Sequence, residues 1–245
     1  MAEILDQIYR SKTVSDEQGN TYPLRANIDP LEGRFIADLI ARHPAIKSTA
    51  EVGCAYGLSS LHICEAIQGR AGAHHVIVDP FQNTNWKGIG VSNLRRSGID
   101  FFELIEEGSE FALPRLAKER RGTFDFVFID GWHTFDHTLI DLFYANLMIK
   151  VGGIIVIDDC SKPAVAKAVT YVSRYPAYEV LAQSDRSWRG RLASSVVTAV
   201  PRSVLGSVVP HIVYDRLVSK RKYATMVALH KVAEDERDWN WFASF

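Results

Sequence analysis

The sequence has few cysteines and no long apolar run. Its three cysteines, Cys54, Cys64 and Cys160, do not show the spacing of a metal centre or a redox pair. We therefore expect free thiols and a reducing cytoplasm. No stretch reaches the roughly 20 apolar residues that a membrane-spanning helix needs. Residues 1–10 contain acids where a signal peptide has its apolar centre, so we expect neither a signal peptide nor a membrane partner.

A large excess of charge of one sign is also missing. The 245 residues include 28 Lys and Arg and 29 Asp and Glu, which gives a formal net charge of -1. This balance gives no overall reason to expect a nucleic acid as partner, although it leaves a local basic patch open. An apolar content of 47% and a charged content of 23% are ordinary for a globular protein. The length suits one α/β domain with additions, or at most two small domains.

The pattern of apolar residues predicts an N-terminal arm followed by a helix. Residues 1–30 are polar and carry many turn-forming residues. Asp29 and Pro30 then have the residue types of a helix cap and a first helical position. Apolar residues at helical spacing continue to about Arg42.

A regular alternation of strands and helices follows. Strands are predicted at 49–52, 75–78, 101–105, 124–129, 154–157 and 178–182, and helices at 58–68, 86–96, 110–119, 135–148 and 163–174. The pair Gly152-Gly153 is interpreted as the turn before the fifth strand. This rhythm favours a doubly wound, mainly parallel sheet with helices on both faces, in a Rossmann-like core over 31–183. A last strand within 223–232 would complete seven strands.

The segment 184–222 breaks the alternation and is predicted to be an insertion. Its apolar runs, 192–200 and 204–213, favour a lid or a dimer surface, because such runs usually bury against protein. Three arginines would either bind an anionic group or form a solvated basic face: Arg186, Arg189 and Arg191. After the last strand, the tail that ends at 245 is expected to pack onto the core through Trp239, Trp241 and Phe242.

The loop after the first strand of the alternation is rich in glycine. It reads Glu51-Val-Gly-Cys-Ala-Tyr-Gly-Leu-Ser59. Gly53 and Gly57 allow a tight turn and a close approach of a ligand to the backbone. Ser59 lies near a helix start, where free N–H groups favour a carboxylate. The spacing is not the G-x-G-x-x-G fingerprint of dinucleotide sites. A turn needed only for packing is the alternative.

Polar residues follow the next two strands as well. Asp79 ends the second strand about 20 residues beyond the glycines, where an acid can accept hydrogen bonds from ribose hydroxyls. A turn or helix-cap aspartate is the alternative. Ser109 follows the third strand and would meet an adenine edge, act as a helix cap, or do both.

Three carboxylates follow the fourth and fifth strands. Asp130-Gly-Trp-His133 comes after one strand and Asp158-Asp159 after the other. Parallel strands end at one edge of a sheet, so the carboxylates should converge, and oxygen ligands of this kind suit Mg²⁺. A solvated turn is the alternative for Asp158 and Asp159. Trp132 would be core or a stacking surface, and His133 a cap or a general base.

The stretch from Asp29 to about Leu181, with the last strand, resembles class I S-adenosylmethionine (SAM)-dependent O-methyltransferases. It is most similar to the small cation-dependent enzymes of the catechol type and to bacterial macrolide-sugar and cephalosporin-tailoring enzymes. The resemblance assigns the methionine part of SAM to Glu51, Gly53, Gly57 and Ser59, the ribose to Asp79, adenine to Ser109 and Trp132, and the metal to Asp130, Asp158 and Asp159. Catechol-type enzymes carry a catalytic lysine three residues beyond the first metal ligand. This chain has His133 there, which departs from the family, but an imidazole can also act as the base.

The resemblance implies methyl transfer from SAM to a small-molecule or sugar hydroxyl, assisted by Mg²⁺ or a similar cation. The apolar runs of 184–222 lead us to expect a homodimer. The acceptor site is expected between the N-terminal arm, the loop after Asp79 and the segment 184–222. Alternatives are a nonmethylating, oxygenase-like tailoring enzyme or a SAM-binding protein of the same fold. A nucleic-acid methyltransferase would need an Asn/Asp-Pro-Pro-Tyr type motif, and a nicotinamide-dependent oxidoreductase a different glycine spacing.

Overall fold

The computed structural model describes residues 2–25, 27–184 and 223–244. The predicted insertion 184–222 lies outside the described residues except for Ser184. The three arginines and two apolar runs predicted to form a basic face, a lid or a dimer surface fall in this undescribed part.

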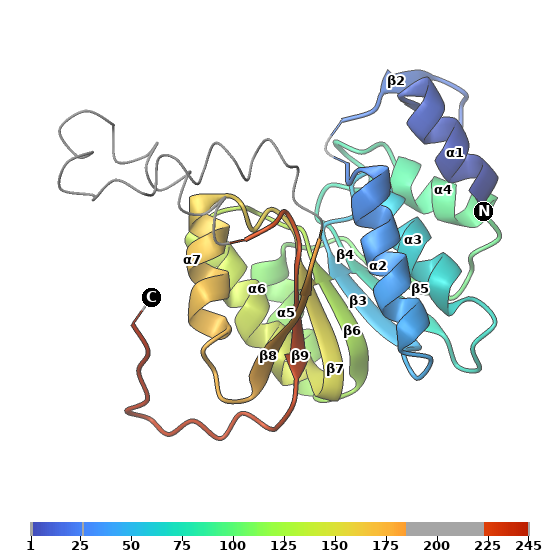
Figure 1. Ribbon diagram of the computed structural model, residues 1–245. Helices are drawn as coiled ribbons and strands as arrows, with labels where there is room; N and C mark the ends of the chain where they lie inside the picture. Colours follow the sequence, from blue (N-terminus) through green and yellow to red (C-terminus); the bar gives the residue numbers. More distant parts are fainter. Residues whose placement is uncertain (1, 26, 185–222, 245) are drawn as a thin grey trace, which may run out of the picture.

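A seven-stranded sheet forms the centre of the fold (Figure 1). Its strands are β3 (Ser48–Val52), β4 (His74–Val78), β5 (Phe102–Ile105), β6 (Phe124–Ile129), β7 (Ile149–Ile157), β8 (Tyr178–Gln183) and β9 (Val227–Lys231). The order across the sheet is β5-β4-β3-β6-β7-β9-β8, and β9 is antiparallel to both its neighbours. The other pairs are parallel. The strand order reverses between β3 and β6, which is where open α/β sheets bind their ligands.

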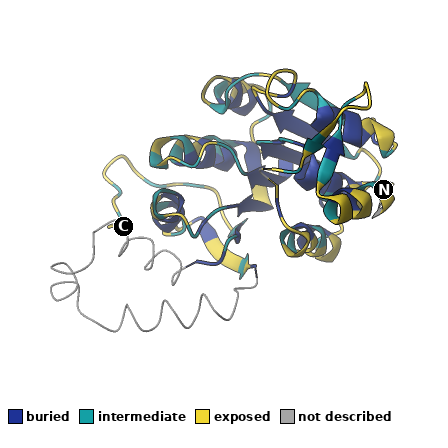
Figure 2. Cartoon of the chain, turned by 90° about the horizontal axis from the view of Figure 1, so that it is seen from above, coloured by how far each residue is buried: buried dark blue, intermediate teal, exposed yellow. Residues whose placement is uncertain are grey.

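Helices cover both faces of this sheet. They are α1 (Ala2–Ser11), α2 (Pro30–Arg42), α3 (Leu58–Ile67), α4 (Ile89–Arg96), α5 (Ser109–Glu119), α6 (Phe135–Met148) and α7 (Pro163–Val172). One apolar core contains residues of α1 to α4, and the other contains residues of α5 to α7. Seen from above, the buried strands lie between helices whose outer sides are exposed (Figure 2). The doubly wound, mainly parallel fold predicted from the sequence is confirmed.

Strand β6 shows why the sheet has two cores. All six of its residues are buried. Side chains alternate along a strand, so Phe126 and Phe128 pack on the α1–α4 side while Val127 and Ile129 pack on the α5–α7 side. A nearly all-apolar run of this kind, interrupted here only by Asp125, is typical of a central parallel strand.

Helix α2 begins as predicted. Asp29 is its N-cap, and its Oδ1 accepts hydrogen bonds from Leu31 N at 2.7 Å and Glu32 N at 2.9 Å. Glu32 Oε2 accepts in return from Asp29 N at 2.8 Å. This reciprocal capping box fixes the position of Glu32 at the start of the helix.

The N-terminal 30 residues are more ordered than the predicted arm. They contain helix α1 and a hairpin of β1 (Thr13–Ser15) and β2 (Thr21–Pro23). Leu5 and Ile8 of α1 are buried, and Tyr9 Oη donates to Ile28 O at 3.2 Å. The prediction was wrong here because it treated residues 1–30 as a polar arm, although Ile4, Leu5 and Ile8 have the spacing of one helix face.

Strand β7 also differs from the prediction. It begins at Ile149 and continues through Gly152 and Gly153, which were expected to form a turn. Gly152 has φ of +85°, and the pairing with β6 shifts register between Phe124 and Phe126. The two glycines therefore form part of a β-bulge inside the strand.

Two further element boundaries differ from the prediction, and the expected packing of the C-terminal tail is partly wrong. Helix α4 begins at Ile89, after a turn at 86–88, and β9 covers only the centre of the predicted 223–232. Trp241 packs against Tyr171 and Tyr175, but Trp239 and Phe242 are exposed. Among the described residues, no helix has the length and apolar character needed to cross a bilayer.

Candidate functional site

A cavity of about 1210 Å³ lies at the carboxyl ends of the central strands. Its wall includes residues from the loops after β3, β4, β6 and β7, from the start of α5, and from the segment before α2. Ligand cavities typically span about 300–1,000 Å³. The volume is therefore sufficient for a cofactor together with a second small molecule.

The glycine loop after β3 forms one wall. Gly53 has φ of +85°, and a Cβ there would overlap the carbonyl oxygen of Asp130. Gly57 has φ of +81°, and a Cβ would lie 2.7 Å from Gly90 O. Both glycines are therefore needed for backbone packing as well as for their left-handed conformation. Gly53 and Ser59 line the cavity; Gly57 does not appear in the cavity wall.

Asp79, at the end of β4, holds the glycine loop in place. Its Oδ2 accepts hydrogen bonds from Cys54 N at 3.0 Å, Ala55 N at 2.9 Å and Gln82 Nε2 at 3.2 Å. Its Oδ1 accepts one, from Phe81 N at 2.8 Å. The carboxylate is buried at the cavity wall, and Oδ1 retains capacity for a further donor.

Glu51 was predicted to bind the ligand directly, but it does not appear in the cavity wall. Its side chain is fully buried beneath the glycine loop, where Oε1 accepts a hydrogen bond from Ser60 Oγ. The same oxygen lies 3.6 Å from His75 Nε2. Because strand side chains alternate between faces, the carboxylate of Glu51 faces the α1–α4 core and supports the loop from below.

Ser109 and Trp132 lie on the opposite wall. Ser109 is the first residue of α5, and Gly108 rather than Ser109 is the N-cap. The Trp132 side chain is 59% exposed, so it is a surface residue of the cavity and not part of the core. Its ring centroid lies 6.5 Å from that of Phe81. The two rings form an aromatic rim beside Ser109.

An acidic cluster completes the site, and we define it as Asp130, His133, Asp159 and Lys162. His133 Nε2 lies 3.1 Å from Asp130 Oδ1 and 2.9 Å from Asp159 Oδ2. Lys162 Nζ lies 2.5 Å from Asp159 Oδ2 and 3.1 Å from His133 Nδ1. The cluster thus contains two carboxylates, an imidazole and an ammonium. Each carboxylate lies beside a group that can carry a proton.

Asp158 and Asp159 point in different directions although they are neighbours. Asp159 has φ of +55°, and its N–H donates to Asp158 Oδ1 at 2.6 Å. Ligand atoms of Asp130, His133 and Asp159 lie within 4.8 Å of one another, and Asp158 is not part of this group. The structure therefore brings together two of the three predicted metal ligands and replaces the third by His133.

Similarity to known proteins agrees with this arrangement. Residues 50–160 match a family described as "Methyltransferase domain". No curated protein sequence is significantly similar to the chain. Among solved structures, an O-methyltransferase from Bacillus cereus in complex with S-adenosylhomocysteine (SAH) shares 14% identity, with a TM-score of 0.62 over 94% of this chain and 90% of that one.

Two further solved structures have the same fold. A methyltransferase from Podospora anserina, bound to SAH, shares 15% identity, with a TM-score of 0.60 over 94% of this chain and 86% of that one. An O-methyltransferase from Streptomyces achromogenes involved in tomaymycin synthesis, in complex with SAM, shares 15% identity, with a TM-score of 0.54 over 85% and 82%. These solved structures share the fold of this chain, and the match at residues 50–160 is to a methyltransferase domain. The Rossmann-like methyltransferase fold expected from the sequence is thus confirmed.

Burial and charge set the proton affinities of the acidic cluster. Hydrogen bonds to Asp130 and Asp159 raise the pKa of His133 to about 9. Burial raises the pKa of Asp130, while for Asp159 the hydrogen bonds from His133 and Lys162 outweigh burial and lower the pKa. Burial and the charge of Asp130 raise the pKa of Asp158 to about 9, so that carboxyl keeps its proton at neutral pH.

The ligand atoms that the acidic cluster offers are of the kinds that bind divalent cations. Carboxylate oxygens are the ligands that Mg²⁺ prefers, and imidazole suits transition metals. Asp130 and Asp159 supply two carboxylates, and His133 supplies a nitrogen within reach. Lys162 is an additional cation at the same place. Its ammonium group already neutralises part of the carboxylate charge of the cluster.

Several residues of the cavity wall were not identified from the sequence. Asn27, Ile28 and Glu32 come from the N-terminal part, and Trp86 from the loop after β4, which agrees with the regions where the acceptor was expected. Lys162 also lines the cavity. Its place three residues beyond Asp159, directly before a helix, is the only signal that the sequence offers for it.

Asp141, on α6, lies behind the cavity wall and predicts a pH-dependent stability. Burial raises its pKa to about 6, although the nearby hydroxyl of Ser109 acts in the opposite direction. The unfolded chain should release this proton near pH 4, before the native state does, so stability falls as pH rises from about 4 to 6 and then levels off. We expect Asp141→Asn to remove this loss. The unfolding free energy of the variant minus that of the wild type should be about 2 kcal/mol larger at pH 7.5 than at pH 4.5.

Urea denaturation at the two pH values measures this difference. Asp100→Asn is the control, because Asp100 is exposed and should show the same difference from wild type at both pH values. A pH-independent effect of Asp141→Asn would mean that Asp141 is ionised in the native state.

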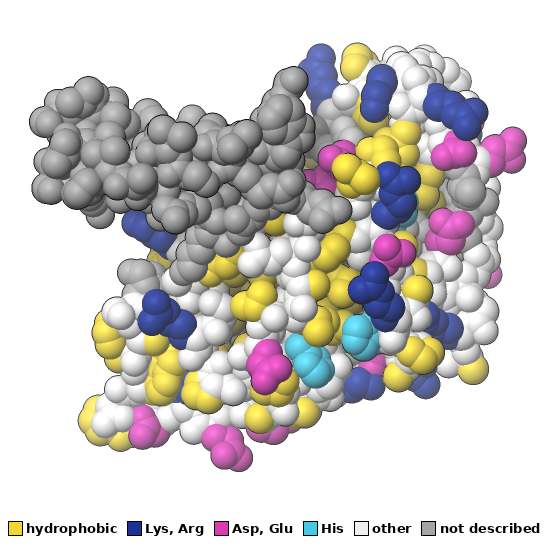
Figure 3. Space-filling view, viewed as in Figure 1, with side chains coloured by type: hydrophobic (Ala, Val, Ile, Leu, Met, Phe, Trp, Pro, Cys, Tyr) yellow, Lys and Arg dark blue, Asp and Glu magenta, His cyan; other side chains and the backbone are white. Residues whose placement is uncertain are grey.

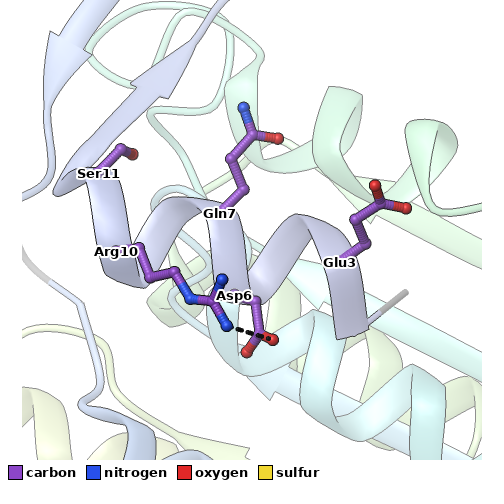
Figure 4. Close-up of a pocket in the computed structure, with 5 residues that line it drawn as sticks. All are labelled: Glu3, Asp6, Gln7, Arg10 and Ser11. Atoms are coloured by element: carbon purple, nitrogen blue, oxygen red, sulfur yellow. Dashed lines mark ion pairs between the residues drawn. The ribbon is translucent and has the colours of Figure 1, made fainter.

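Among the described residues, the other surfaces show no comparable convergence of functional groups. On the face seen in Figure 3, basic and acidic side chains are interspersed and form no large field of one sign. A depression on α1 is lined by five exposed side chains that extend from one helix (Figure 4). Asp6 and Arg10 form an ion pair there at 3.6 Å. Such a pair supports the helix and has no buried group beneath it.

Proposed function

We propose that the protein transfers the methyl group of SAM to an oxygen atom of a small-molecule acceptor. The main support is that one cavity joins the glycine-loop wall to the acidic cluster, so a cofactor and a proton-accepting group share one space. Positioning two reactants in this way supplies much of the rate of a displacement reaction. The names of the solved relatives from Bacillus cereus and Streptomyces achromogenes also support oxygen as the acceptor atom.

On the cofactor side, each proposed role follows from position. Gly53 and Ser59 would receive the methionine part of SAM, with Gly57 shaping the loop and Glu51 supporting it from below. Oδ1 of Asp79 has room for a ribose hydroxyl. Ser109 and Trp132 would flank adenine, since a hydroxyl and an exposed indole lie together on that wall.

On the acceptor side, His133 takes the proton, and it does so in its neutral form, which is the minor form at neutral pH because its pKa is about 9. Its Nε2–H faces Asp130 and Asp159, which hold the imidazole and stabilise its protonated form. Its Nδ1 receives the proton of the acceptor hydroxyl at the place that Lys162 Nζ now holds. The acceptor oxygen forms a bond to the methyl carbon while the S–CH₃ bond breaks, and the bonding electron pair stays on sulfur, which yields SAH.

We further propose that a divalent cation such as Mg²⁺ assists the reaction. Asp130 and Asp159 would hold it, and His133 lies within ligand distance. A cation bound there would lower the pKa of an acceptor hydroxyl that coordinates it. Asp158, the third ligand expected from the resemblance, would act only after a rotation that breaks its hydrogen bond with Asp159 N.

A homodimer and a cytoplasmic location also remain proposals. The three cysteines are buried free thiols, which agrees with a reducing compartment. Light scattering of the purified protein would decide the oligomeric state.

Asp79→Ala should weaken SAM and SAH binding by about 10-fold to 150-fold. The substitution removes both the ribose acceptor and the bonds that hold the amides of Cys54 and Ala55. Calorimetric titration with both ligands measures the change, and thermal unfolding shows whether the variant is folded. Asp100→Ala, at an exposed site, is the control and should bind as the wild type does.

The same titration tests the proposed function. Micromolar binding of SAM and SAH by the wild type, followed by SAH release when catechols and sugar diols are supplied as acceptors, would support it. Binding without transfer to any oxygen acceptor would favour a SAM-binding protein. If neither SAM nor SAH binds, the proposal is wrong.

A further inference from the structure

The side chain of Lys162 lines the cavity instead of capping the helix that follows it. It is the N-cap residue of α7, its side chain is about half exposed, and it lines the cavity. As an N-cap it makes no side-chain hydrogen bond to the helix. Its ammonium instead reaches back to Asp159 and His133, at 2.5 and 3.1 Å.

The surroundings of this ammonium are strongly acidic. Asp130 and Asp159 converge on His133, and both Asp158 and Glu32 lie near enough for the charges of neighbouring carboxylates to raise their pKa values. Converging carboxylates repel one another unless a cation or a proton joins them. Among the described residues, Lys162 is the lysine or arginine whose ion pair reaches this group.

A divalent cation would need an atom that Lys162 already contacts, the Oδ2 of Asp159. On His133, Lys162 Nζ contacts Nδ1, whereas Nε2 is the nitrogen that faces the two carboxylates. Metal–oxygen distances are about 2.1 Å for Mg²⁺. A metal ion at this distance from Asp159 would lie within a few ångströms of the ammonium and be repelled by it.

We propose that Lys162 is a built-in cation of the acidic cluster that competes with a divalent metal ion for Asp159, so that this side chain sets the metal affinity of the site. The inference rests on the acidic cluster being the metal site of the proposed function, but it needs no knowledge of the acceptor. Withdrawal of Lys162 also leaves Nδ1 of His133 free for the acceptor proton. Binding of the metal ion and exposure of Nδ1 of His133 to the acceptor are therefore linked, because both require Lys162 to move away.

Binding of Mn²⁺ to the purified protein tests this competition. Free Mn²⁺ is measured by electron paramagnetic resonance during titration, without SAM or acceptor. We expect Lys162→Met to bind Mn²⁺ at least tenfold more tightly than the wild type, because the competing charge is gone. Lys162→Arg keeps the charge and should resemble the wild type. Lys167→Met removes the same charge from an exposed site on the same helix and should change the affinity less than twofold.

Three results would overturn the proposal. These are a gain of less than tenfold in Lys162→Met, an equal gain in Lys167→Met, and an equal gain in Lys162→Arg. Adding Asp159→Asn to Lys162→Met should cancel the gain, and its persistence would also contradict the proposal. Circular dichroism of each variant confirms folding. Failure of the proposed function is seen separately, in SAM titration and methyl transfer, neither of which enters the Mn²⁺ measurement.

Discussion

Gly53→Ala is expected to destabilise the protein by at least about 4 kcal/mol and to abolish SAM binding. A methyl group at this position would overlap the carbonyl oxygen of Asp130, which belongs to backbone and cannot rotate away. The left-handed φ of +85° adds its own strain for any residue with a side chain. Because the loop and the end of β6 form opposite walls of one cavity, relief of the overlap would push these walls apart.

Gly19→Ala is the control that separates the strain of a positive φ from the overlap with the backbone of Asp130. Gly19 has nearly the same φ, +83°, but nothing lies within 4 Å of its added Cβ. It should therefore lose only about 1–2 kcal/mol and bind SAM normally. Urea denaturation and calorimetry measure both variants. Equal losses of stability in the two variants would show that the backbone at Asp130 adjusts, and that the close approach is not required.

Asp130→Asn is expected to lower methyl transfer by about 10³-fold while SAM affinity stays within about threefold. Asp130 holds His133 through Nε2 and is one of the two carboxylates available to a metal. Asparagine keeps the size of the side chain but loses the charge. The glycine loop and Asp79, which carry the proposed cofactor contacts, are untouched.

Initial rates of SAH formation with an acceptor from the panel, measured with and without EDTA, check this expectation. Asp38→Asn is the control, because Asp38 is exposed on α2 and does not line the cavity. Full activity of Asp130→Asn in EDTA would exclude both the metal role and the holding of His133.

The fold could be predicted from the sequence because its signals are local and repeated. The nearly all-apolar run 124–129 and the helix start Asp29-Pro30 each specify one element, and the structure has them as predicted. Helix α1 was missed because a polar arm was expected there, and its contacts with distant residues do not show in local spacing. Tyr9, for example, reaches Ile28 O and, at 3.4 Å, His62 Nε2.

The candidate site was predicted less completely, for a geometric reason. The sequence indicates which residues follow each strand, so Asp79, Asp130 and Asp159 were expected at one sheet edge. It does not indicate that Asp159 adopts a positive φ, which separates it from Asp158. Nor does it indicate that the side chain of Glu51, near the end of β3, faces the α1–α4 core and not the cavity.

The role of Lys162 could not be read from the sequence either. A lysine directly before a helix is usually a solvated charge, and spacing alone does not show which way its side chain turns. Only the fold places its ammonium between Asp159 and His133.

The two halves of the cavity come from different parts of the chain. The cofactor wall lies within the matched domain, residues 50–160, whereas Asn27, Ile28, Glu32, Lys162 and Thr225 of the cavity wall lie outside it. On the proposed function, we therefore expect substitutions in the N-terminal segment or beyond β7 to alter acceptor choice more than binding of the methyl donor. The acceptor side of such a cavity can change while the cofactor side is kept, because the two come from different stretches of the chain.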